Sequence, residues 1–391
     1  GFPSPRPAPL LGWMKKALED YRVVLLDQRG TGQSSAVTAK TLNKMSNGDA
    51  NLQTEYLANF RQDSIVKDSE ALREALGAGK ITLLGQSFGG FCILSYLSMF
   101  PESIETALFT VGLAPVNVPV DEVYRATYQR VKERNRRFYN RYPMDKARVR
   151  NIVKHLRNND VKLPSGVRLT PRRFLSLGIG LGSLSGMESM HWLIEGAWDG
   201  DELAFAFLKH VESSQAFDTN PIYWLLHEAI YVDGSQKHTS TPSKWSADRI
   251  HREMMASDIP NLDYERDIYT DNNEEQPIYF TGEMVFPWFA EDYAELKDIK
   301  ETAELLASKN DWGELYNIDK LKNTAVPCAA LVSYEDLYVE RQFSEETAAI
   351  LGDNCKLWIT NEHQHSGLRD DGYHVLAKLL QMVRGEINVP S

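Results

Sequence analysis

The residues best suited to chemistry surround Ser87, in the run Gly85-Gln86-Ser87-Phe88-Gly89-Gly90. An apolar run precedes this motif and a helical pattern follows it, which is the strand-turn-helix context of a Gly-x-Ser-x-Gly nucleophile elbow. Such a turn strains the serine backbone and projects its hydroxyl at the start of a helix, where the helix dipole favours a developing negative charge. The backbone N–H of Phe88 is predicted to donate one hydrogen bond to an oxyanion. These features predict a nucleophilic Ser87 rather than an idle serine in a glycine-rich turn.

A nucleophilic serine needs a general base, and the base needs a carboxylate that orients it. In proteins with this turn the groups follow the order serine, acid, histidine along the chain. The loop after one later predicted strand contains Glu335 and Asp336, and the loop after the next contains His363 and His365. Asp336 is favoured over its neighbour as the acid, whereas both histidines are candidates for the base. His374 falls in the last predicted helix, where a histidine is more often a surface or packing residue.

The elements that must position these loops are buried strands alternating with helices. Short apolar runs typical of strands buried on both faces occupy residues 22–26, 81–84, 106–111, 327–333 and 356–360. Helical patterns occupy residues 57–76, 89–100, 344–351 and 370–384. Strands separated by helices predict a parallel sheet, so the three loops should leave the same edge of it and converge.

A different pattern fills the middle of the chain. Residues 120–139 read as a charged helix, and further helical stretches rich in Trp, Tyr and Phe follow without the rhythm of buried strands. The sheet pattern returns near residue 327. The sequence therefore predicts an α/β core formed by residues 1–115 and 321–391, interrupted by a mainly helical insertion at residues 116–320.

Composition excludes several classes of protein. The 391 residues carry a formal net charge of −11, whereas a nucleic-acid partner needs a basic surface. No run of 18 or more apolar residues is present, so no membrane span is predicted. Cys92, Cys328 and Cys355 are far apart and form no Cys-x-x-Cys pair, which indicates free thiols in a reducing, cytoplasmic compartment rather than disulfides or a zinc site. No metal and no other cofactor is expected.

Several motifs make the chain similar to the prolyl aminopeptidases, also called proline iminopeptidases, in their larger subgroup. The similar segments are Asp27–Ser34, Gly85–Gly90, Leu226–Tyr231, Thr281–Met284, Phe286–Trp288, Glu335–Val339 and His365–Asp370. The resemblance implies an α/β-hydrolase fold with a mostly parallel sheet and an inserted helical cap domain. It also implies a serine aminopeptidase that releases an N-terminal residue, preferentially proline, through an acyl-enzyme. Carried over, the catalytic residues are Ser87, Asp336 and His365, and His363 becomes a neighbour.

The resemblance further implies that Glu228 and Glu283 recognise the substrate's free amine. A protonated proline nitrogen offers two N–H donors and one positive charge, which two carboxylates can accept at about 1.5–3 kcal/mol per charge-assisted bond. Two carboxylates facing one another would repel, so one pKa should be raised in the empty site. The expected partners are therefore peptides with a free N-terminus.

Four aromatic residues and the start of the chain are also relevant to this site. Tyr223, Trp224, Phe286 and Trp288 form either a pocket wall for a pyrrolidine ring or ordinary cap core. Gly1 matches the end of the family's His-Gly-Gly-Pro-Gly loop, which supplies the second oxyanion donor. We therefore expect the natural protein to extend upstream and the chain as printed to be poorly active without that loop.

Two other functions compete with this interpretation. An esterase or amidase for small neutral substrates would share Ser87 and its partners but would not need Glu228 and Glu283. A non-catalytic binding protein of the same fold would have lost part of the Ser-Asp-His set, all three members of which are present here.

Overall fold

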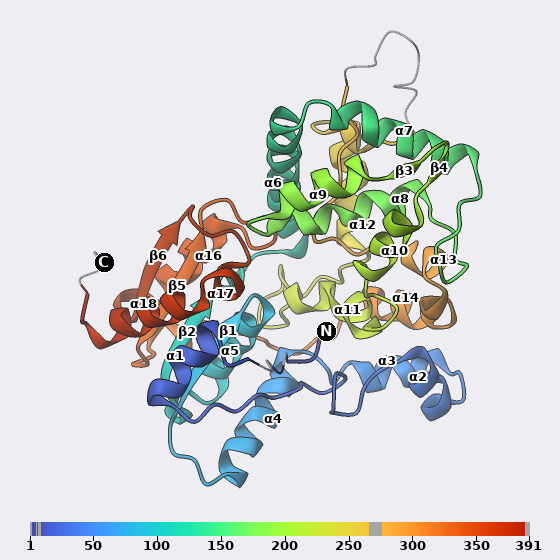
Figure 1. The fold of residues 1–391 in the computed structure, drawn as a ribbon. Coiled ribbons are helices and arrows are strands. Elements are labelled where there is room, and N and C mark those ends of the chain that lie inside the picture. The colour runs from blue at the N-terminus through green and yellow to red at the C-terminus, as the bar shows by residue number, and fades with distance from the viewer. Residues whose placement is uncertain (1, 5, 7–8, 266–275, 388–391) are drawn as a thin grey trace.

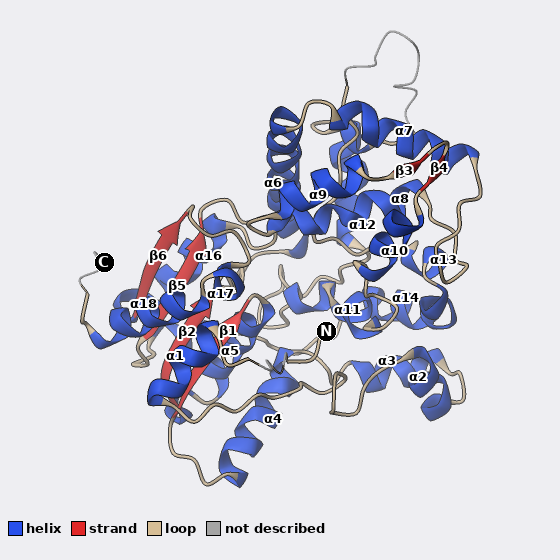
Figure 2. Ribbon diagram, viewed as in Figure 1, coloured by secondary structure: helices blue, strands red, loops and turns tan. Residues whose placement is uncertain are grey.

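The computed structural model describes residues 2–4, 6, 9–265 and 276–387, and a four-stranded parallel sheet lies at the centre of its α/β part. The strands are β1 (Ile81–Gln86), β2 (Ile104–Thr110), β5 (Cys328–Ser333) and β6 (Cys355–Thr360), in the order β1-β2-β5-β6. Neighbouring strands are all parallel, so their carboxyl ends meet at one edge, as Figure 2 shows.

The strand sequences explain why helices cover both faces of this sheet. Every residue of β5 is buried, as expected for an apolar strand between two helical layers. Alternate residues of a strand point to opposite faces. Leu108 and Leu331 belong to a smaller core cluster with residues of α1 (Gly12–Asp20) and α18 (Gly372–Arg384). Phe109 and Val332 belong to the larger core on the face covered by α5 (Phe88–Met99) and α16 (Arg341–Leu351).

The helices that accompany the sheet come from both ends of the chain (Figure 1). They are α1 (Gly12–Asp20), α4 (Gln62–Ala75), α5 (Phe88–Met99), α16 (Arg341–Leu351), α17 (Gly367–Asp370) and α18 (Gly372–Arg384), with the short 3-10 helices η1 (Pro101–Ser103) and η6 (Gly352–Asn354). Helices α2 (Ala39–Ser46) and α3 (Ala50–Leu57) lie away from the sheet, where α3 packs against α14 (Lys300–Ser308). Helix α5 is apolar on all sides because it is packed between the sheet and its neighbours α4 and α15.

The chain between β2 and β5, residues 111–327, is mainly helical, and we call it the inserted segment. Its helices are α6 (Val120–Arg141), α7 (Asp145–Asn158), α8 (Pro171–Leu175), α9 (Gly186–Glu195), α10 (Phe205–Ser213), α11 (Pro221–Leu226), α12 (Ser246–Ala256), α13 (Phe289–Asp292), α14 (Lys300–Ser308) and α15 (Ile318–Lys322). A ribbon of β3 (Trp198–Asp199) and β4 (Glu202–Leu203) and the 3-10 helices η2 (Ser176–Gly182), η3 (Glu228–Tyr231), η4 (Pro260–Leu262) and η5 (Ala294–Ile299) complete it. Most of it lies beyond one end of the sheet in Figure 1.

Two local predictions are wrong. Residues 22–26 belong to no strand and Val24 is 56% exposed, because an apolar run becomes a strand only where a neighbouring strand pairs with it. The helical pattern over residues 57–76 is interrupted between α3 and α4. There Arg61 has an extended backbone, and its guanidinium donates to the carbonyls of Ala229 and Val232 in the inserted segment. These long-range hydrogen bonds outweigh the local periodicity.

The structure also bears on the predictions about free thiols and membrane spans. Cys92, Cys328 and Cys355 are all free thiols, as predicted, although Cys328 and Cys355 are register neighbours on β5 and β6. Within the described ranges, no helix is both long and apolar enough to span a membrane.

Candidate active site

Ser87 occupies a strained turn between β1 and α5. Its backbone angles are φ 52° and ψ −123°, a region that residues with a side chain rarely adopt and that costs about 1–3 kcal/mol. Two backbone hydrogen bonds maintain the turn: the Ser87 N–H donates to Thr110 O at 3.0 Å, and the Gly90 N–H donates to Ser87 O at 2.8 Å. Strain of this kind, kept in place by its surroundings, is typical of a nucleophile displayed at a sheet edge.

Close backbone approach explains the small residues around this turn. A Cβ on Gly90 would lie 2.2 Å from Gly112 O, and a Cβ on Gly112 would lie 2.4 Å from Ser87 O. Both contacts are with backbone atoms, which cannot move aside without displacing the turn. Any side chain at either glycine would therefore shift Ser87.

The structure describes only one of the two predicted oxyanion donors, Phe88. Phe88 is the first residue of α5, so its N–H has no partner within the helix and is free for a ligand. Gly1 lies outside the described residues.

Asp336 and His365 form a buried hydrogen-bonded pair at the carboxyl ends of β5 and β6. His365 Nδ1 lies 2.9 Å from Asp336 Oδ2 and 3.1 Å from Oδ1. His365 is 8% exposed and Asp336 is 2% exposed. The N–H groups of Tyr338 and Val339 donate to Asp336 Oδ1 at 2.8 and 3.1 Å, which fixes the carboxylate. With its proton on Nδ1, the imidazole keeps Nε2 as a base.

Other contacts place the backbone of His365. The Gln86 side-chain amide, next to Ser87, donates to His365 O at 3.0 Å, and the His365 N–H donates to Gly182 O in the inserted segment at 3.1 Å. The ring of Tyr338 meets the imidazole edge-on, with 4.4 Å between ring centroids. The sheet edge and the inserted segment therefore both orient the base.

A nucleophilic serine and its base should lie within hydrogen-bond reach, but no bond between Ser87 Oγ and His365 is formed among the described side chains. Catalytic hydrogen bonds are often long in the absence of substrate and tighten in the substrate complex. The bond from Gln86 to the His365 carbonyl nevertheless ties the elbow to the histidine loop.

The competing side chains have other surroundings. Within the described part of the chain, the buried Nδ1 of His363 has no hydrogen-bond partner, and its ring packs edge-on against Trp358. Glu335 forms an ion pair with Arg137. His374 is exposed on α18. Asp336 is therefore paired with His365 rather than with the other two histidines.

The environment of His365 makes its proton affinity dependent on Asp336. Burial lowers the pKa of His365, but the charge and hydrogen bond of Asp336 raise it, with a further contribution from Glu283, and the net effect is a raised pKa. A base must be neutral to accept a proton. As the pH falls, activity should therefore be lost at a higher pH than it would be with an ordinary histidine, whose pKa is near 6.5.

This balance predicts the effect of Asp336→Asn on pH dependence. The substitution removes the charge that raises the pKa of His365, so the acidic limb of kcat/KM should move to lower pH. The optimum rate should also fall by about 10⁴-fold, because the amide no longer favours the productive tautomer. A pH–rate profile from pH 4 to 9 measures both effects. An unchanged acidic limb would mean that another group titrates.

Glu283 bonds to a tyrosine and acts on His365 through its charge. The Tyr223 hydroxyl donates to Glu283 Oε1 at 2.5 Å, and the carboxylate is close enough to raise the pKa of His365. It thus lies within electrostatic range of the imidazole, with one oxygen engaged by a tyrosine.

Glu228 has a different environment. Its two oxygens accept the backbone N–H groups of Ser246 and Ala247 at 3.0 and 2.8 Å, at the start of α12. Burial raises the pKa of Glu228 to about 7, although these hydrogen bonds oppose the shift. The raised pKa that we expected from mutual repulsion therefore occurs, but its cause is burial rather than Glu283.

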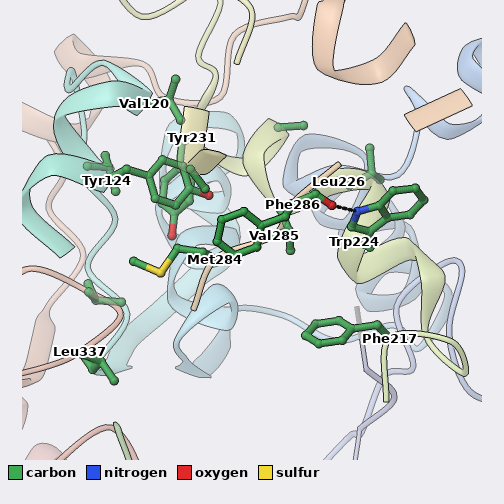
Figure 3. Close-up of a cluster of buried hydrophobic side chains, with 14 of the residues drawn as sticks. Val120, Tyr124, Phe217, Trp224, Leu226, Tyr231, Met284, Val285, Phe286 and Leu337 are labelled. Atoms are coloured by element: carbon green, nitrogen blue, oxygen red, sulfur yellow. Dashed lines mark hydrogen bonds between the residues drawn. The ribbon is translucent and has the colours of Figure 1, made fainter. Parts of the chain in front are cut away.

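The aromatic side chains near the two glutamates are mostly buried. Trp224 and Phe286 belong to the main hydrophobic core, and Trp224 Nε1 donates to Phe286 O at 2.9 Å. Figure 3 shows this bond, with Phe286 between Trp224 and the rings of Tyr124 and Tyr231. Trp224 and Phe286 thus fit the description of cap core, whereas Tyr223 contacts Glu283 through its hydroxyl.

Sequence reasoning missed Gln86, Gly182 and Arg134, which form hydrogen bonds with the loops that carry Asp336 and His365. Gln86 is adjacent to the nucleophile and could have been found from the elbow motif, but nothing in the sequence distinguishes the other two. Among the described residues no group of three or more His, Cys, Asp or Glu side chains is arranged to hold a metal ion.

Comparison with known proteins defines the class first. The family described as "alpha/beta hydrolase fold" matches residues 7–154, and the parallel sheet agrees with it, so the protein has the α/β-hydrolase fold. A proline iminopeptidase of Aeromonas sobria is 44% identical over 98% of this chain and 85% of its own length. Proline iminopeptidase aneH of Aspergillus aculeatus is 35% identical over 96% and 81%. The chain belongs to the proline iminopeptidase family.

A solved structure of proline iminopeptidase from Mycobacterium smegmatis is a distant neighbour. It is 10% identical, with a TM-score of 0.40, over 92% of this chain and 78% of that chain.

Proposed function

We propose that this protein is a serine aminopeptidase that releases an N-terminal proline from peptides. Ser87 is the nucleophile, His365 the general base and Asp336 the carboxylate that orients it, and residues 116–320 form a cap domain over the core of residues 1–115 and 321–391. The observation that carries the proposal is the buried Asp336–His365 pair, which a hydrogen bond from Gln86 joins to the strained turn of Ser87. The family relationship supports the choice of substrate.

The reaction follows from these groups. His365 Nε2 accepts the Ser87 proton while Oγ attacks the carbonyl carbon of the first peptide bond, and the Phe88 N–H stabilises the resulting oxyanion. Collapse of the tetrahedral intermediate breaks the C–N bond, and the imidazolium returns its proton to the leaving amine. Water, deprotonated by the same imidazole, then hydrolyses the prolyl ester and regenerates Ser87.

Glu283 and Glu228 are proposed to recognise the substrate's free amine, with unequal roles. Glu283 lies within electrostatic range of His365, and an N-terminal residue places its amine only two bonds from the scissile carbonyl. Glu228 already accepts two backbone N–H groups, so its carboxylate also stabilises the start of α12. Of the two, Glu283 is therefore expected to contribute more directly to amine binding.

Glu283→Gln tests this role. The substitution keeps the shape but removes the charge, so kcat/KM for free prolyl substrates should fall by about 10- to 100-fold, the equivalent of one charge-assisted hydrogen bond. Activity on N-acetylated substrates should be low and unchanged. The matched control is Glu291→Gln, an exposed glutamate of the inserted segment paired with Arg172, which should behave like wild type. Full activity of Glu283→Gln on free prolyl substrates would contradict the role.

The decisive assay is a panel of aminoacyl-naphthylamides with and without N-acetylation. We expect the prolyl compound to be cleaved fastest and its N-acetylated form to be rejected, because acylation removes the positive charge with which the two carboxylates would pair. Equal cleavage of both forms would favour an esterase or amidase. Failure of a fluorophosphonate to label Ser87 would favour a non-catalytic binding protein.

A further inference from the structure

Helix α6 presents three arginines to the loops that carry the acid and the base. Arg130, Arg134 and Arg137 are four and three residues apart and therefore share one side of the helix. The middle one, Arg134, is 8% exposed, and its burial lowers its pKa. A buried guanidinium is costly unless its N–H groups find acceptors, so the acceptors of Arg134 stabilise it in this position.

A single nitrogen of Arg134 joins two separate loops. Its Nη2 donates to Glu335 O at 3.1 Å and also to Gln364 Oε1. Glu335 immediately precedes Asp336 in the loop after β5, and Gln364 immediately precedes His365 in the loop after β6. The guanidinium thus bonds to the residue before each member of the Asp336–His365 pair.

The neighbouring arginines do not form such a bridge. Arg130 pairs with Glu340 through two bonds of 2.6 Å, and Arg137 pairs with the side chain of Glu335. Arg137 also pairs with Glu133 on α6 itself. In the described part of the chain neither arginine bonds to the loop after β6, and both are more exposed than Arg134. Among the three, Arg134 alone connects the loop of the acid to the loop of the base.

We propose that Arg134 is a positioning residue that fixes the spacing of the two loops, and thereby aligns the Asp336–His365 hydrogen bond with Ser87. This inference rests on the proposed function, because it assigns Arg134 to the same reaction without contact with the substrate. Misplacement of a catalytic group by about 1 Å can cost about 100-fold in rate, so a bridge one residue away from both members has a large effect on kcat.

The effect of losing this bridge on the pKa of His365 depends on the charged and titratable groups that face the imidazole. They are Asp336 from the loop after β5, Glu283 and the Tyr338 ring, and Arg369 on α17. Arg134 acts on His365 through the loops. Loosening of the bond to Asp336 therefore removes the main influence that raises the pKa of His365, and the acidic limb of the rate profile moves to lower pH.

The experiment compares Arg134→Gln and Arg134→Lys with Arg130→Gln in the full-length enzyme. The matched control removes an ion pair from the same helix and the same loop after β5 but breaks no bridge. For Arg134→Gln we expect kcat to fall by about 10- to 100-fold, KM to change less than about threefold, and the acidic limb of kcat/KM to move to lower pH. Arg134→Lys, which keeps a charged donor, should recover part of kcat. Arg130→Gln should stay within about threefold of wild type with an unchanged acidic limb.

Several outcomes would overturn the inference. One is a folded Arg134→Gln enzyme with wild-type kcat and an unchanged acidic limb, and another is a matching loss of kcat in Arg130→Gln. If Arg134→Gln does not fold, Arg134→Lys decides alone, and wild-type kcat with a wild-type acidic limb counts against the proposal. An active Ser87→Ala enzyme would instead refute the proposed function, so the two failures are distinguishable.

Discussion

Replacement of Ser87 by alanine in the full-length protein is expected to lower kcat by about a millionfold, as for serines of other triads. The residual rate would come from binding and from the oxyanion donors, which do not depend on the hydroxyl. The measurement is single-turnover or long-time hydrolysis of a prolyl naphthylamide, corrected for contaminating peptidases.

The fold should survive this substitution. The Ser87 side chain accepts no hydrogen bond at the start of α5, and the backbone bonds of the turn involve Ser87 N and O rather than Oγ. An unchanged thermal midpoint together with lost fluorophosphonate labelling would assign the defect to chemistry. Turnover within tenfold of wild type would refute the mechanism.

The second large effect separates two histidines that are two residues apart. His365→Ala should be about as damaging as the loss of Ser87, because members of one triad act as a unit. His363→Ala should cost far less in kcat, since that imidazole lies against Trp358 and has no bond to Asp336. Steady-state kinetics of both variants on one substrate provide the comparison, and a reversal of the two effects would transfer the role of base to His363.

The strands of the sheet were predictable because burial on both faces leaves a direct mark on composition. The apolar runs before Ser87 and before Asp336 became β1 and β5, within one or two residues of the expected bounds. The run at residues 22–26 is also apolar but pairs with no strand in the described part of the chain, and pairing is a long-range property that composition does not encode. The break between α3 and α4 escaped prediction for the same reason.

For the candidate site, too, local sequence patterns predicted some features and not others. The order of Ser87, Asp336 and His365 along the chain and their places after strands followed from local pattern, and a parallel sheet brings such loops to one edge. The choice between His363 and His365 had no local basis, since both lie in one loop. In the structure that choice depends on backbone contacts of His365 with Gln86 and Gly182.

Arg134 shows the limit of such reasoning. The charged pattern of α6 predicts an amphipathic helix but not which arginine turns inward. Its partners, Glu335 and Gln364, lie 201 and 230 residues further along the chain. A contact between residues so far apart has no signature in either segment alone.

These long separations also determine when the active site can exist. Thr347 Oγ1 on α16 donates to Ala114 O just beyond β2, across 233 residues, and β5 pairs directly with β2. Closing so large a loop must precede the docking of β5 and β6, and contacts of such high order form slowly. During synthesis Ser87 emerges long before Asp336 and His365, so a nascent chain has a nucleophile without its base. Under the proposed mechanism, Ser87 therefore gains its base only after β5 and β6 have joined the sheet.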